Sequence, residues 1–185
     1  DVPSDLGDKA RYRLAVLCQQ AGNDPRAAGL IDELVQGKTV LKIEPTLLQW
    51  AAGALLDQGD SPAAIRVGRV VLSDSDAPPG SRQKAGLIAG KAAEALDRRR
   101  EAEALWREAL ALPEPTRARA ETGLALGGLL SAKTDFKGAQ MAFEEGGRSA
   151  AANNMLDIQA RTYSGLGQNA EAAGDLAEAN RYYRS

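Results

Sequence analysis

The segment Ala102–Leu110 reads Ala-Glu-Ala-Leu-Trp-Arg-Glu-Ala-Leu. Its apolar residues fall at positions i, i+3, i+4, i+7 and i+8, which form one stripe along an α-helix. Glu and Arg occupy the remaining face. Ala makes up about a fifth of the chain, well above its usual share, and it is the strongest helix former. This segment therefore predicts an amphipathic helix that packs through small residues, in a chain that is helical throughout.

The same pattern recurs along the chain. The small residue that Ala102 represents reappears at steps of 37, 38, 37 and 40 residues, at Ala27, Ala64, Ala102, Ala139 and Ala179. Each copy is preceded by a pair of small or Leu-Gly residues and followed by a large residue. A single helical hairpin of this kind cannot bury its apolar stripe alone, so successive hairpins must stack. We expect the large residues Trp106, Phe143 and Tyr183 to fill the space toward the next repeat.

This pattern resembles the tetratricopeptide repeat (TPR), most closely at Ala102–Leu110 and at 174–183. The resemblance implies an all-α, right-handed α-solenoid of about five helix–turn–helix repeats. The expected single solenoid spans residues 1–185, with repeats at 8–37, 45–76, 80–113, 116–150 and 154–185. The period exceeds the family's 34 residues. Such stretched repeats are similar to those of bacterial cell-envelope assembly proteins, which implies an envelope or periplasmic location over the cytoplasm. We expect the chain to be a fragment of a longer protein.

The prolines mark the expected helix boundaries. Pro25 and Pro62 follow Asp24 and Ser61, whose side chains are expected to cap the helices that begin there. Pro45, Pro79 and Pro115 fall where the first helices of repeats should start. The predicted helices are 8–21, 24–37, 45–58, 62–74, 80–97, 100–112, 116–133, 136–149, 154–173 and 176–185.

Composition argues against several functions. The chain has no His and a single Cys, Cys18, which lies on an apolar stripe and is expected in the core. Nucleophile systems that require His and zinc sites that contain His are therefore excluded. We expect no catalysis, no cofactor and no metal site. A net charge of −2 disfavours nucleic acid as a partner. No stretch is long and apolar enough to span a membrane.

The resemblance also implies where a partner would bind. First helices of TPR hairpins line a concave face, and positions between the packing residues point into it. Some family members grip an acidic C-terminus there with Lys and Asn residues, but only Lys84 matches that cluster here. The remaining surface is apolar and centred on Trp50, Leu87 and Ile88. The predicted partner-binding residues are Tyr12, Val16, Gln49, Trp50, Gly53, Leu56, Leu87, Ile88, Lys91, Leu124 and Gly128.

The leading functional hypothesis is a scaffold or adaptor that binds a protein, as a peptide or a helix, in an apolar concave groove. A second hypothesis is an RNA-binding protein built of helical hairpins of the pentatricopeptide kind. A third is a self-assembly module in which copies associate through exposed end repeats. The acidic balance and the Leu-Gly and Gly-Asp pairs favour the first hypothesis over the second.

Overall fold

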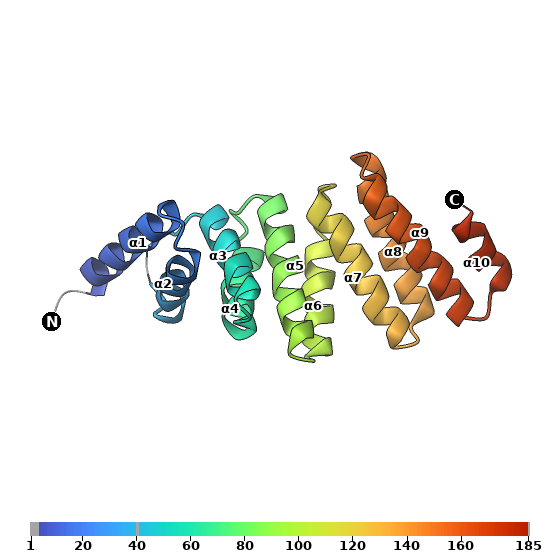
Figure 1. Cartoon of the computed structure of the whole chain (residues 1–185), viewed down its shortest axis with the longest axis horizontal. Helices are drawn as coiled ribbons and strands as arrows, with labels where there is room; N and C mark the ends of the chain where they lie inside the picture. The colour runs from blue at the N-terminus through green and yellow to red at the C-terminus, as the bar shows by residue number, and fades with distance from the viewer. Residues whose placement is uncertain (1–3, 40, 185) are drawn as a thin grey trace.

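A computed structural model describes residues 4–39 and 41–184, and within these residues it contains ten α-helices and no strand (Figure 1). The helices are α1 (Ser4–Gln20), α2 (Asp24–Gln36), α3 (Pro45–Asp57), α4 (Ser61–Ser73), α5 (Pro79–Ala95), α6 (Arg99–Leu110), α7 (Arg117–Ala132), α8 (Phe136–Ala152), α9 (Leu156–Ala172) and α10 (Leu176–Tyr183). Most boundaries lie within three residues of the predicted ones. The largest difference is at α1, which begins at Ser4 rather than at residue 8.

The helices follow one another in a row of hairpins from α1 to α10 (Figure 1). Consecutive helices pack together, and the odd-numbered helices α3, α5, α7 and α9 also contact one another in series. Among the even-numbered helices of the described residues, only α2 and α4 have comparable contact. The odd-numbered helices therefore lie closer together and line the concave face, while the even-numbered helices form the convex face. The predicted all-α solenoid is confirmed.

The turn inside each hairpin explains a difference from the predicted caps. The residues that cap α2 and α4 are Asn23 and Asp60, one position earlier than expected. The Asn23 side chain accepts a hydrogen bond from the backbone N–H of Arg26 at 3.4 Å, and the Asp60 side chain accepts one from that of Ala63 at 3.1 Å. The residues before them, Gly22 and Gly59, have positive φ angles of 72° and 83°, which Gly adopts without strain. The left-handed residue turns the chain, so the next residue is the one placed to cap.

The predicted small residues lie between the helices of each hairpin. The repeated Ala residues, including Ala27 and Ala139, are all buried. Trp106 is fully buried, and its indole Nε1 donates to the carbonyl oxygen of Leu87 at 3.3 Å. The Trp106 ring fills the space that the missing side chain of Gly90 leaves on α5, and a Cβ atom there would overlap the ring.

Two expectations about the core were wrong. Tyr183 is 51% exposed, because its ring packs against Gly167 on α9 but no further hairpin of the described residues covers its other side. Cys18 is only half-buried, since among the described residues α1 packs chiefly against α2.

Polar groups also join successive repeats. Asp32 on α2 is buried and accepts two hydrogen bonds from Arg66 on α4, at 2.8 and 2.7 Å. Gln83 on α5 is fully buried, and its Nε2 donates to the carbonyl oxygens of Leu112 and Glu114, at 2.9 and 2.8 Å. The hydrogen bonds from Gln83 hold the α6–α7 loop against α5, so the position of α7 depends on a side chain of the preceding repeat.

Candidate functional site

A pocket of about 420 Å³ opens on the concave face between α3 and α5. Trp50, Gly53, Ala54 and Asp57 lie at i, i+3, i+4 and i+7 on α3, so one stripe of this helix faces the pocket. Its lining consists of Gln49, Trp50, Gly53, Ala54, Asp57 and Gln58 from α3, Lys84 and Ile88 from α5, and Asp24 and Pro25 from α2.

Four of the predicted partner-binding residues meet in this pocket, which we call the Trp50 pocket. They are Gln49, Trp50, Gly53 and Ile88. Trp50 and Ile88 are half-buried and pack against the core with part of their surface. A Cβ atom on Gly53 would lie 3.7 Å from Cδ1 of Ile88, which is an ordinary contact distance. The pocket therefore has room beside Gly53 and an apolar wall opposite it.

Leu87 does not belong to this surface, and its predicted exposure was wrong. Its side chain is only 4% exposed. Neighbouring residues on a helix point about 100° apart. Ile88 faces the concave side, so Leu87 points into the core, and its own carbonyl oxygen accepts the hydrogen bond from Trp106.

The remaining predicted residues lie elsewhere along the concave side. Tyr12 and Val16 are half-buried on α1, and Leu56, also half-buried, packs against the core from α3. Lys91 on α5 pairs with Glu121 on α7 at 3.9 Å. Leu124 and Gly128 follow on α7, where Leu124 is half-buried and Gly128 is exposed. None of these residues lines the Trp50 pocket.

The charged groups differ between the two halves of the concave face. Toward the C-terminal half, Lys91 on α5 pairs with Glu121 on α7, and Arg117 on α7 donates to Asp157 on α9 at 2.7 Å. This hydrogen bond lowers the pKa of the Asp157 carboxyl. At the Trp50 pocket, by contrast, Asp24, Asp57 and Lys84 take part in no ion pair among the described residues.

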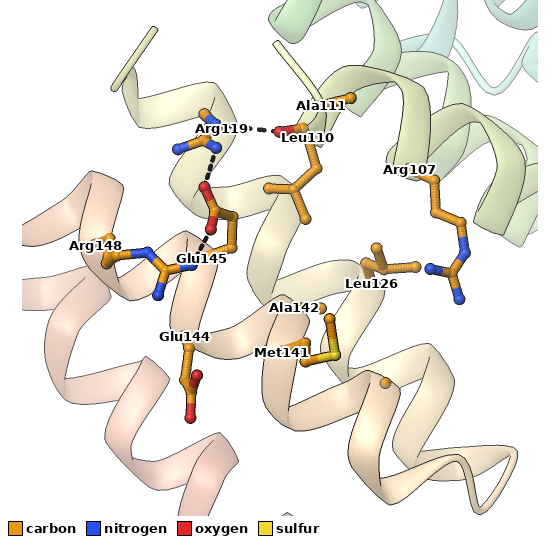
Figure 2. Close-up of a pocket in the computed structure, with 11 residues that line it drawn as sticks. Arg107, Leu110, Ala111, Arg119, Leu126, Met141, Ala142, Glu144, Glu145 and Arg148 are labelled. Carbon is orange, nitrogen blue, oxygen red and sulfur yellow. Dashed lines mark hydrogen bonds and ion pairs between the residues drawn. The ribbon is translucent and has the colours of Figure 1, made fainter. Parts of the chain in front are cut away.

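A second groove lies on the convex face between α6 and α8 and has a volume of about 570 Å³ (Figure 2). Leu110, Leu126 and Ala142 form its apolar floor, and the Met141 side chain, 62% exposed, lies over it. This groove was not predicted from the sequence, because only the first helices of the hairpins were expected to bind a partner. The available signal was Met141, an apolar residue two positions after the packing residue Ala139.

The rim of the convex groove carries ion pairs. Glu145 on α8 accepts hydrogen bonds from Arg148 and from Arg119 on α7 (Figure 2). The bond from Arg148, assisted by that from Arg119, lowers the pKa of the Glu145 carboxyl, while desolvation opposes this shift. Arg119 also donates to the carbonyl oxygen of Leu110 at 3.2 Å. Both arginines are already partnered: Arg119 joins α7 to α8, while Arg148 pairs with Glu145 within α8.

Within the described ranges there is no group of three or more side chains suited to hold a metal ion. No helix among residues 4–39 and 41–184 combines the length and apolarity needed to cross a bilayer.

The row of hairpins, with small residues between helices and a concave face of first helices, defines a TPR-like helical-repeat protein. No family model matches the sequence, and no curated protein matches it. Solved structures share the fold. MamA is 18% identical, with a TM-score of 0.67 over 92% of this chain and 90% of its own.

Two further structures show the same likeness. BtubC from P. vanneervenii is 20% identical, with a TM-score of 0.65 over 92% of this chain and 74% of its own. The TPR-like repeats of a kinesin light chain from Podosopora anserina are 18% identical, with a TM-score of 0.61 over 100% of this chain and 94% of theirs. These similarities confirm the predicted TPR-like repeat fold.

Proposed function

We propose that this protein is a scaffold that binds a segment of a partner protein on its concave face, at the Trp50 pocket. The observation that carries the proposal is the pairing of Trp50 with Ile88 across an open pocket of about 420 Å³. Elsewhere the chain buries its other tryptophan completely. A half-exposed Trp beside an aliphatic side chain is the kind of anchor that dominates binding energy in protein interfaces.

The size of the pocket favours a side-chain anchor. A volume of about 420 Å³ lies at the lower end of the range for ligand sites and fits one or two side chains. The bound partner therefore inserts an apolar residue beside Trp50 while the rest of its segment runs along the concave face.

RNA binding is the weaker alternative at this site. A protein that binds phosphate groups needs a surplus of Lys and Arg to release counterions. The Trp50 pocket has two carboxylates, Asp24 and Asp57, and one ammonium group, Lys84. With an overall charge of −2, this balance opposes a nucleic-acid backbone.

A second protein-binding surface is supported by a specific observation. The convex groove is the larger of the two, and Met141 is 62% exposed over it. Met side chains adapt to partners of different shape, so they are common at binding surfaces. A variant at Met141 therefore belongs in any test of the concave site.

The best test blocks the Trp50 pocket without removing core packing. In Gly53→Gln, the new side chain starts with an ordinary contact to Ile88 and extends into the pocket. The matched control is Gly29→Gln, because Gly29 lies inside α2 and a Cβ atom there meets nothing within 4 Å. Each variant of the full chain is immobilised, and captured proteins are identified by mass spectrometry.

We expect the parent protein and Gly29→Gln to capture the same partner, and Gly53→Gln to lose at least about tenfold in affinity for it, because a central anchor is displaced. Equal capture by Gly53→Gln and the parent would contradict the proposal. If Met141→Asp lost the partner instead, the convex groove would be the binding site.

A further inference from the structure

The charge of Asp57 has no structural explanation within the fold. Asp57 is the last residue of α3, and this last turn contains no basic residue. The C-terminus of a helix carries a partial negative charge, so a carboxylate there is unfavourable. No ion pair of the described residues neutralises it, and the side chain is exposed at the edge of the Trp50 pocket.

Asp24 adds a second carboxylate to the same pocket. It is the first residue of α2 and also takes part in no ion pair of the described residues. Its position at a helix N-terminus is electrostatically favourable, so the fold itself accounts for it. Together with Asp57, it nevertheless makes this side of the pocket negative.

Lys84 lies toward the other end of the Trp50 pocket. The short turns before and after α4 make α3 and α5 parallel, and Gly53 on α3 lies opposite Ile88 on α5. Asp57 comes four residues after Gly53, whereas Lys84 comes four residues before Ile88. The two charges therefore lie about one helical turn to either side of this contact, roughly 12 Å apart along the helices.

We infer that the partner segment held in the Trp50 pocket carries a Lys or Arg directly beside its aliphatic anchor, with the cation placed at the Asp57 end. This inference rests on the proposed function and names the chemistry of the partner. The cation supplies the charge that the end of α3 lacks, and it can also lie against the face of the Trp50 ring. Lys84 repels a cation from the opposite end, whereas Lys91, which follows Ile88 on the Asp57 side, is paired with Glu121 on α7. These charges therefore fix the direction in which the segment binds.

The test uses two acetylated and amidated hexapeptides that contain no Trp. They are identical except that a single Leu is followed by Arg in one and by Glu in the other. Binding to the full chain is measured from its tryptophan fluorescence, in the parent and in Asp57→Asn and Lys84→Gln. Asp57→Asn removes an unfavourable charge at a helix end, so the melting temperature should hold or rise.

We expect the Arg peptide to bind the parent at least about fivefold more tightly than the Glu peptide, as expected for one close charge pair in water. Asp57→Asn should reduce this preference by about the same factor, and Lys84→Gln should strengthen binding of the Arg peptide. Equal binding of both peptides, a preference for Glu, or no binding of either at millimolar concentration would overturn the inference.

Failure of the inference can be told apart from failure of the proposed function. If a captured partner is lost in Gly53→Gln but binds Asp57→Lys with full affinity, the concave site stands and its preference for a cation is wrong. If Gly53→Gln has no effect on capture, the concave site itself is wrong.

Discussion

The ring of Phe143 on α8 occupies the space that Gly127 leaves open on α7. A Cβ atom on Gly127 would lie 2.6 Å from Cδ1 of Phe143, too close for a normal contact. Gly165 lies on α9, the first helix of the next hairpin, and also contacts the ring. A Cβ atom on Gly165 would lie 2.7 Å from Cε1 of Phe143. Phe143 is thus inserted between glycines of two successive repeats and couples them.

This relationship predicts opposite effects at two neighbouring glycines. Gly127→Ala should destabilise the protein by about 1–2 kcal/mol, because overpacking outweighs the better helix propensity of Ala. Gly128→Ala should stabilise it by about 0.5–1 kcal/mol, since a Cβ atom there meets nothing within 4 Å. Urea unfolding of both variants checks this. Similar changes in the free energy of unfolding of the two variants would show that Phe143 does not pack against Gly127 of α7.

Trp106 should contribute more to stability than Trp50. Trp106→Ala should lower the free energy of unfolding by about 3–5 kcal/mol, because the residue is fully buried and its ring packs against Gly90 on α5. Trp50→Ala should cost about 1–2 kcal/mol, since only part of its side chain is covered. Denaturant midpoints of the two variants give the comparison. A small effect at Trp106 would mean that the register of the repeats is wrong.

Glu145 should make stability depend on pH. Arg148 and Arg119 hold the pKa of its carboxyl in the folded state below the ordinary value of 4.5, so the unfolded state binds the proton more readily. Its contribution is therefore present above pH 4.5 and is lost as the pH falls through the folded-state pKa.

The matching variant is Glu145→Gln, which resembles the protonated acid. The parent should be more stable than this variant by about 0.5–1 kcal/mol at neutral pH, and the difference should vanish between about pH 5 and pH 3. Thermal unfolding across this range measures it. A difference that stayed constant down to pH 3 would mean that Glu145 has no stabilising ion pair.

Much of the fold was predictable because helix packing demands the same small residues in every repeat. Ala27, Ala64 and Ala102 occur at one position of the pattern, and all are buried. The capping residue was placed one position late, at Asp24 and Ser61, because the prolines after them indicate the first turn, and the left-handed conformation of Gly22 and Gly59 before the caps was not predicted. Which residue caps the helix depends on the φ angle of Gly22 in the first hairpin and of Gly59 in the second.

The candidate site was only partly predictable. Trp50 and Gly53 follow from the register of α3, since they share one helical stripe. Leu87 and Ile88 are both apolar, and which of them faces the core is decided by the rotation of α5 against α6, where Trp106 bonds to the backbone of Leu87. The convex groove depends on how far α6 stands from α8, and the sequence pattern does not contain this distance.

A partner that docks at Trp50 must change the surroundings of that side chain. The chain contains two tryptophans, one half-exposed in the pocket and one fully buried, so a chain labelled with fluorotryptophan gives one fluorine NMR signal for each. A Trp50→Phe variant assigns them. When an unlabelled captured partner is added to saturation, we predict that the Trp50 signal shifts while the Trp106 signal stays in place. A saturated complex in which the Trp50 signal does not move would show that the partner binds elsewhere.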